Sequence, residues 1–276
     1  MKSLKPRLLT AVIGIPSLVV LLLLAEIWNP VVAIIVALAT SFMTGEYLNA
    51  NKLLKSLSVS IPCLLFSLLM PFLINTAYIY LTLVLYLLVM FIVMIANHKR
   101  ISYSELAYSV TGTLLISLGM SAISLICSGG TGISFYFVTI FALPWMADAG
   151  GFFIGASMGK HKLCPSISPK KTVEGAVGGV VFCVISAVVV GLLFRYLITP
   201  DISINFAALI LLGFIDAPIS IIGDLSFSLI KRRYNIKDYS SIFPGHGGML
   251  DRCDSIIFTA PIIVLVNQII PIITVV

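Results

Sequence analysis

The sequence predicts an all-α protein, a polytopic bundle of about nine membrane-spanning helices with its N-terminus on the cytoplasmic side. Of the 276 residues, 59% are hydrophobic and only 10% are charged, and the mean hydropathy is +1.13. A soluble domain has about 25% charged residues, so this chain lacks the polar surface that a soluble protein needs. Apolar runs of about 20 residues also recur, and that length crosses a ~30 Å hydrocarbon core as a helix. We therefore expect an integral membrane protein.

Nine apolar runs, separated by Gly, Pro and polar residues, are the candidate spans. The gap between the third and fourth is short, because only Asn75 and Thr76 interrupt the apolar pattern there. We expect the first span to be retained as a helix, since no small-x-small cleavage site follows its basic start. The nine spans cover roughly residues 8–25, 29–49, 57–75, 77–97, 105–127, 133–157, 173–197, 203–232 and 253–275.

Lys and Arg residues alternate with these spans as the positive-inside rule predicts. If the N-terminus is cytoplasmic, 16 of the 17 Lys and Arg residues fall in or beside cytoplasmic segments, and only Arg195 lies near an outer loop. The distribution therefore predicts nine spans with an outer C-terminus. The two largest polar loops, 158–172 and 233–252, then face the cytoplasm, where we expect the chemistry.

The net positive charge of the chain does not indicate a nucleic-acid partner. Its net charge is +6, but the basic residues gather at the ends of apolar runs, as membrane anchors do. The five cysteines are scattered without a C-x-x-C pair, so neither a zinc site nor a disulfide framework is indicated. We divide the chain into N-terminal helices (1–100), middle helices with the first cytoplasmic loop (101–172) and C-terminal helices with the second loop (173–276).

Acidic residues on both sides of the second loop are candidate metal ligands. Asp224, Ser228 and Lys231 share one face of a predicted helix, and Asp251 and Asp254 are expected to open the next helix on a common face. Mg²⁺ prefers oxygen ligands and needs one or two carboxylates together with substrate phosphates. The alternatives are a helix-dipole or capping role for Asp254 and, for Asp224, a structural ion pair with Lys231 or another basic residue.

Basic residues and a glycine-rich turn accompany these acids. Lys231, Lys237 and Arg252 are candidates to neutralise phosphate oxygens, although anchoring at the membrane edge explains any one of them. The turn from Pro244 to Gly248 contains His246, Gly247 and Gly248, and such a turn before a helix exposes main-chain amides to an anion. For His246 a proton carrier, a phosphate donor and a plain turn residue all remain open.

The first loop repeats the combination of lysines, hydroxyls and glycines. Lys170 and Lys171 are either membrane-edge anchors or a clamp for nucleotide phosphates, and the hydroxyls of Ser168 and Thr172 favour the clamp. We expect Ser168 to cap the following helix, with Pro169 in its first turn. The next helix carries small residues, Gly175 and Gly179, one turn apart, which predicts close packing against another helix.

Four further acids lie among apolar residues. We expect Asp148 and Glu174 each to pair with a loop lysine and to support the site from behind. Glu46, near the end of the second span, is interpreted as structural. Asp216, eight residues before Asp224, either faces the same polar cavity or hydrogen-bonds a neighbouring helix.

The string from Ser228 to Asp254 closely resembles the signature of the CDP-diacylglycerol synthase family, also called phosphatidate cytidylyltransferases. A second string, Ser-Pro-Lys-Lys-Thr-x-Glu-Gly from Ser168 to Gly175, is similar to another motif of that family. The resemblance covers roughly residues 145–255. Cys253 departs from the family, which generally has an aliphatic, Phe or Thr residue there, and we expect it to pack. The matching signature residues are Ser228, Lys231, Arg232, Lys237, Asp238, Pro244, His246, Gly247, Gly248, Asp251, Arg252 and Asp254.

This resemblance implies that CTP and phosphatidate react to give CDP-diacylglycerol and pyrophosphate. It implies a Mg²⁺-dependent enzyme, with K⁺ as a possible second ion, that forms a homodimer in the bacterial inner membrane with its site facing the cytoplasm and membrane lipids. The implied metal ligands are Asp224, Asp251 and Asp254. The implied catalytic residues are Asp224, Lys231, Lys237, Asp251, Arg252 and Asp254, and the implied nucleotide-binding residues are Ser168, Lys170, Lys171, Thr172, His246, Gly247 and Gly248.

Two other functions fit parts of the pattern. A CTP-dependent polyprenol or phytol kinase transfers the γ-phosphoryl group instead, so its lipid product carries no cytidine. A transporter needs acids and broken helices near the middle of the membrane. Here most acids lie at the predicted cytoplasmic edge and no inverted repeat is visible, so a transporter is the weaker interpretation.

Overall fold

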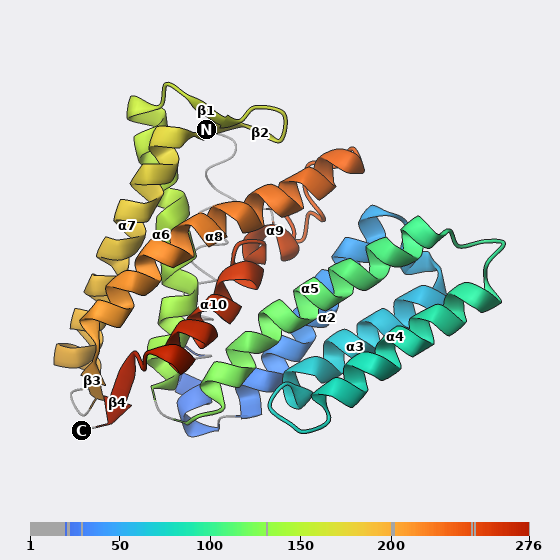
Figure 1. The fold of residues 1–276 in the computed structure, drawn as a ribbon, viewed down its shortest axis with the longest axis horizontal. Coiled ribbons are helices and arrows are strands. Elements are labelled where there is room, and N and C mark those ends of the chain that lie inside the picture. The colour runs from blue at the N-terminus through green and yellow to red at the C-terminus, as the bar shows by residue number, and fades with distance from the viewer. Residues whose placement is uncertain are drawn as a thin grey trace. The chain divides into compact units, whose positions relative to one another are not determined.

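A computed structural model describes residues 20, 23–28, 30–130, 132–199, 202–243, 245 and 247–275. The chain forms two compact units (Figure 1). The first contains residues 1–128 and 233–253, and the second contains residues 129–232 and 254–276. The second predicted loop therefore belongs to the first unit, whereas the first predicted loop belongs to the second unit.

The first unit is a helical bundle around a core of aromatic and sulfur-containing side chains. Phe66 stacks on Tyr86 with ring centroids 4.2 Å apart, beside the fully buried Cys63, Met70 and Met90. These residues are apolar over successive turns, so each helix buries one face against its neighbours. The helices are α2 (Pro30–Ala50), α3 (Leu57–Leu73), α4 (Ile79–Ala96), α5 (Tyr103–Cys127) and the short α9 (Leu250–Cys253), with a 3₁₀ turn at Leu53–Lys55.

The second unit consists of four long helices and two small antiparallel sheets. Strand β1 pairs with β2 in a hairpin between α6 and α7, and β3 pairs with β4. The helices are α6 (Ile133–Met158), α7 (Val173–Leu193), which continues as a π-helical turn (Phe194–Ile198), α8 (Phe206–Arg233) and α10 (Ile256–Ile269). The strands are β1 (Lys162–Cys164), β2 (Ser168–Thr172), β3 (Ile202–Ile204) and β4 (Ile273–Val275).

Helices α6 and α7 approach each other closely through glycines. A Cβ atom at Gly175 would lie 2.7 Å from the carbonyl oxygen of Gly151, and one at Gly179 would lie 2.8 Å from that of Ala147. Both distances are too short for any side chain, so only glycine permits this contact. The close packing predicted from the spacing of Gly175 and Gly179 is confirmed.

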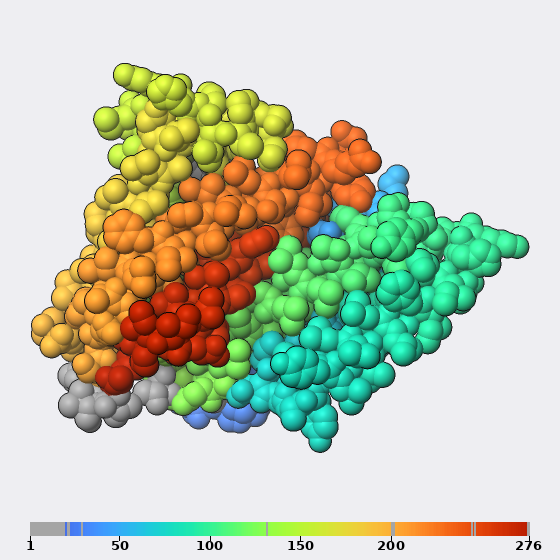
Figure 2. All heavy atoms as spheres, in the orientation of Figure 1, coloured from blue at the N-terminus to red at the C-terminus, as the bar shows by residue number. Residues whose placement is uncertain are grey.

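Helices α8 and α10 run antiparallel and lie side by side within the second unit (Figure 2). At one end, the Asn205 N–H donates to the Ile272 carbonyl at 2.8 Å, next to the paired strands β3 and β4. Towards the other end, the Ser255 hydroxyl donates to the Ser220 carbonyl at 3.2 Å. Because these two contacts set the antiparallel register, Asp216, one turn before Ser220, comes level with Thr259, one turn after Ser255.

Seven helices in the described ranges are long and apolar enough to cross a membrane, and α3 is a shorter apolar helix. The prediction of a mostly helical, polytopic membrane protein is confirmed. The first predicted span, 8–25, lies largely outside the described residues. The count of nine and the cytoplasmic N-terminus therefore stay predictions.

Two expectations about helix ends are wrong. The last predicted span, 253–275, contains α10 only as far as Ile269, because the chain then turns and pairs as β4 with β3. Ser168 does not cap α7, since it lies in strand β2. Thr172 is the cap instead, and its hydroxyl accepts the Gly175 N–H at 3.1 Å.

Candidate functional site

A cavity of about 250 Å³ lies beside the β1–β2 hairpin in the second unit; we call it the polar cavity because lysines and hydroxyls are among its lining residues, together with apolar side chains such as Phe152, Leu163 and Ile221. Helix α6 contributes Asp148, the hairpin contributes two lysines and two hydroxyls, and the first turn of α7 contributes Gly175. A helix N-terminus carries partial positive charge, and hydroxyls and lysines also favour anions. The four residues predicted to clamp nucleotide phosphates, Ser168, Lys170, Lys171 and Thr172, therefore line one cavity, and their binding of phosphate stays a prediction.

An ion pair joins this hairpin to α8. The Lys171 Nζ atom lies 2.6 Å from Asp224 Oδ2, and the two side chains are 23% and 25% exposed. The Ser228 hydroxyl, one turn further along α8, lies 3.5 Å from Asp224 Oδ1. An ion pair of Asp224 with a basic residue, which was one of the alternatives, is therefore present, with Lys171 as a partner.

A second carboxylate, Asp254, lies near this pair in the turn between α9 and α10. It is buried, and its Oδ1 atom accepts the Ser255 N–H at 2.9 Å. Asp224 and Asp148 repel the charge of Asp254, and Lys231 attracts it. The second unit therefore brings Asp148, Asp224 and Asp254 close enough to Lys171 or Lys231 to interact electrostatically with one another or with these lysines.

The donor chemistry of Asp224 and Asp254 fits a hard divalent cation. Carboxylate oxygens are ligands that Mg²⁺ prefers, and two carboxylates suffice when substrate phosphates complete the shell. Within the described ranges, no three His, Cys, Asp or Glu side chains are grouped closely enough to hold an ion by themselves. The residues present thus suit an ion shared with a phosphate substrate.

The glycine-rich loop of the first unit is organised around the carboxylate of Asp251. Its Oδ2 atom accepts the N–H groups of Tyr239 at 2.8 Å and Gly248 at 2.9 Å. Gly247 has a φ of 86°, which favours glycine, and a Cβ atom there would lie 3.0 Å from the same oxygen. Asp251 therefore determines the shape of this loop.

A second carboxylate, Glu46 of α2, holds the same loop from the other side. It accepts the N–H of Met249 at 3.1 Å and of Leu250 at 2.7 Å, and the Ser240 hydroxyl donates to it as well. The sequence indicated a structural role for Glu46 but not its partners. The only local signal was an acid near the end of an apolar helix.

The loop also contains aromatic and basic side chains. Tyr234 packs against Tyr108 with ring centroids 4.9 Å apart, and burial raises the pKa of Tyr234. Lys237 and Arg252 are exposed. Predicted roles for His246 and Pro244 concern residues outside the described part of the chain.

The expected arrangement of Asp251 and Asp254 is wrong in one respect. They do not open a single helix, because α9 ends at Cys253 and a turn at Asp254 and Ser255 precedes α10. Asp251 belongs to the first unit, and Asp254 belongs to the second. Their roles as metal ligands stay predictions.

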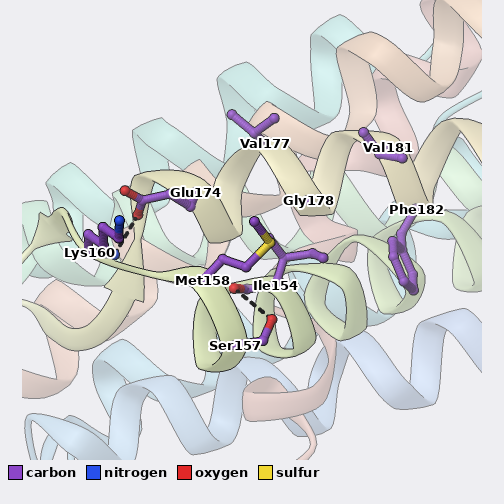
Figure 3. A pocket seen from close by; sticks show the side chains of 9 residues that line it. All are labelled: Ile154, Ser157, Met158, Lys160, Glu174, Val177, Gly178, Val181 and Phe182. Atoms are coloured by element: carbon purple, nitrogen blue, oxygen red, sulfur yellow. Dashed lines mark hydrogen bonds between the residues drawn. The ribbon is translucent and has the colours of Figure 1, made fainter.

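A larger, mainly apolar cavity of about 680 Å³ lies between α6 and α7 (Figure 3). Ile154, Val177 and Val181 are among the side chains that line it, and Lys160 and Glu174 lie at one end. Few polar groups face this cavity, so despite its size it is the poorer candidate for phosphate chemistry.

We expected Glu174 to pair with a lysine side chain, but among the described residues its side-chain partner is His161. Its Oε1 atom lies 2.6 Å from His161 Nδ1, and the N–H groups of Lys160 and His161 donate to the carboxylate. This acid therefore fixes the start of the hairpin against the first turn of α7. Asp148 lines the polar cavity, in line with its expected supporting position.

The fold and the site together define a polytopic membrane protein whose polar cavity combines lysines, hydroxyls and carboxylates. The sequence pattern of the Cytidylyltransferase family matches residues 5–270, so the chain belongs to that family. The resemblance to the CDP-diacylglycerol synthase family is confirmed, and with it a place among nucleotidyltransferases.

Named relatives point in the same direction. A phosphatidate cytidylyltransferase of Staphylococcus haemolyticus (strain JCSC1435) is 34% identical over 169 residues, which are 61% of this chain and 62% of the relative. A phosphatidate cytidylyltransferase of Bacillus subtilis (strain 168) is 38% identical over 130 residues, which are 47% of this chain and 46% of the relative. The matched regions thus span less than two thirds of these relatives.

Proposed function

We propose that this protein transfers the cytidylyl group of CTP to phosphatidate, giving CDP-diacylglycerol and pyrophosphate for phospholipid synthesis. The observation that carries the proposal is the Lys171–Asp224 ion pair beside a cavity of lysines and hydroxyls, in a chain of the Cytidylyltransferase family. The names of the relatives supply the lipid substrate.

In this reaction a phosphate oxygen of phosphatidate attacks the α-phosphorus of CTP. A new O–P bond forms, the bond between the α-phosphorus and its bridging oxygen breaks, and pyrophosphate leaves. The protein has little covalent work to do, so positioning and charge neutralisation supply most of the catalysis.

The residues of the second unit divide this work. Lys170 and Lys171 bind phosphate oxygens, and the first turn of α7 adds its partial positive charge. Incoming CTP separates Lys171 from Asp224, which leaves the Asp224 carboxylate to face a cation. Lys231, which already attracts Asp254, offsets the remaining negative charge.

Asp224 and Asp254 would hold Mg²⁺, and a monovalent ion such as K⁺ would be the second cation. Bound Mg²⁺ neutralises phosphate oxygens and aligns the reacting groups. In the first unit, the sequence predicts phosphate binding by Lys237 and Arg252, with His246, Gly247 and Gly248 as the anion-binding turn. Asp251 is predicted to contribute a further ligand.

The membrane setting suits a lipid substrate. The helices are long and apolar enough to contact acyl chains, while the lysines and hydroxyls of the polar cavity can bind a phosphate headgroup. We place the site on the cytoplasmic side of a bacterial inner membrane, where CTP is present, and the protein in a homodimer.

The test uses purified protein in phosphatidate-containing micelles with CTP labelled at the α-phosphate. Label should move into the lipid fraction, pyrophosphate should appear in equal amount, and EDTA should stop both. Label that remains in CDP while the lipid gains an unlabelled phosphate would identify a kinase instead. Omission of phosphatidate is the control, because hydrolysis of CTP alone releases no labelled lipid.

A further inference from the structure

Asp216 is a charged residue in the middle of α8 that the proposed reaction does not use. It is fully buried, and neither carboxylate oxygen has a hydrogen-bond or ion-pair partner among the residues that the structure describes. It lies eight residues before Asp224, which is about 12 Å along a helix. An isolated ionised carboxylate in such surroundings is costly and must be neutralised.

Two unpartnered hydroxyls come at about the same level as this carboxylate along the pair of α8 and α10. Ser220 is one turn along α8 from Asp216 and shares its face. Thr259 is one turn along α10 from Ser255, and the antiparallel register brings it level with Asp216. Within the described ranges, the side-chain oxygens of Ser220 and Thr259 also lack partners, and both residues are fully buried.

A cation satisfies this group of oxygens better than a proton does. A proton would neutralise Asp216 but would bond only one of its oxygens. A bound cation contacts both carboxylate oxygens and both hydroxyls at once, and it leaves the hydroxyl protons free for nearby carbonyls. A single positive charge also leaves the buried site neutral, whereas a divalent ion would leave an excess charge among apolar helices.

We propose that Asp216, Ser220 and Thr259 bind one monovalent alkali cation that joins α8 to α10. The site is separate from Asp224 and Asp254, and it is independent of the proposed reaction. Its role is to tie two helices that carry the acids of the polar cavity.

The test is thermal unfolding of the purified full-length protein in NaCl, KCl or choline chloride at equal ionic strength, which keeps charge screening constant. We expect Na⁺ or K⁺ to raise the Tm by roughly 2–4 °C over choline. In an Asp224→Asn background, where the second cation of the proposed reaction has lost a neighbouring carboxylate, Asp216→Asn should abolish this difference and should reduce the ²²Na⁺ or ⁸⁶Rb⁺ retained at equilibrium by one ion per chain.

Ser220→Ala and Thr259→Val keep the charge and test the site even if Asp216→Asn fails to fold. Each should raise the cation concentration needed for half of the Tm shift by roughly tenfold. Asp224→Asn should retain the cation-dependent shift, because it changes the other site. The proposal is overturned if the wild-type protein shows no alkali-specific shift, if Asp216→Asn keeps the shift in the Asp224→Asn background, or if Asp224→Asn alone removes it.

Discussion

The carboxylates Asp251 and Glu46 of the first unit and the carboxylate Asp224 of the second unit bind their partners in opposite ways. In the first unit, Asp251 and Glu46 accept N–H groups of the main chain. In the second unit, Asp224 pairs with the side chain of Lys171, and both groups are partly exposed. Main-chain donors cannot leave without rearranging the loop, whereas a lysine side chain can turn to another anion.

This difference suggests two roles: Asp251 and Glu46 stabilise the conformation of a loop, whereas Lys171 and Asp224 are available to bind a ligand. A carboxylate that holds main-chain amides stabilises one loop conformation, and its loss exposes those amides to water. A partly exposed ion pair contributes little to stability, usually ~0–1 kcal/mol, so a phosphate can replace it at low cost. We therefore expect changes in the second unit to affect activity first, and changes in the first unit to affect loop order as well.

The largest effect is expected for Asp224→Asn. Loss of this charge removes a proposed ligand of the cation that neutralises phosphate oxygens, and cytidylyl transfer should fall about 10²–10³-fold. The Tm should change by little, because the pair with Lys171 is partly exposed. The measurement is initial velocity with saturating Mg²⁺, together with thermal unfolding of the same preparation.

Ser226→Ala is the matched control, since its hydroxyl only donates to the Ile222 carbonyl of the same helix. It should keep nearly full activity. If Asp224→Asn retained wild-type velocity, the acid would have no role beyond pairing. A double variant with Lys171→Gln tests the pair directly, because groups that act together give non-additive losses.

A smaller effect, on loop order and activity together, is expected for Glu46→Gln. Hydrogen bonds to a charged acceptor contribute about 1.5–3 kcal/mol each, and the amide of Gln replaces them incompletely. Hydrogen exchange at Met249 and Leu250 should accelerate, and cytidylyl transfer should fall by roughly tenfold as the loop loses its shape.

Glu105→Gln is the control for the loss of a carboxylate. Glu105 belongs to an exposed capping box with Ser102, so its replacement should cost only ~1 kcal/mol and should leave the loop unaffected. If hydrogen exchange at Met249 and Leu250 were unchanged in Glu46→Gln, Asp251 alone would hold the loop. Glu46 would then no longer be an example of a carboxylate that stabilises the loop conformation.

Local pattern predicted the helices well, because span length and breakers act over a few residues. The run 133–157 corresponds to α6, Ile133–Met158. The contacts that build the site connect residues far apart in sequence, such as Glu46 with Leu250, 204 positions away. The pairing of Lys162 with Thr172 likewise depends on main-chain bonds between strands, so the composition of the loop did not reveal it.

The sequence identified the charged residues of the candidate site, but it did not predict which of them contact each other. Lys171 and Asp224 both stood out as charges beside apolar runs, yet only the folded chain brings the hairpin onto α8. The antiparallel register that sets Thr259 level with Asp216 is another non-local consequence, because it depends on the pairing of β3 and β4.

The smallest effect is expected for Thr172→Ala, which removes the cap of α7. The hydroxyl of Thr172 accepts the Gly175 N–H, and loss of such a cap costs about 1 kcal/mol. The hairpin that carries Lys171 ends at this residue, so the KM for CTP should rise a few-fold while kcat changes less. Thr172→Ser keeps the hydroxyl and should restore both stability and KM. If Thr172→Ser behaved like Thr172→Ala, the methyl group rather than the cap would be responsible, and the hairpin would not be positioned through the start of α7.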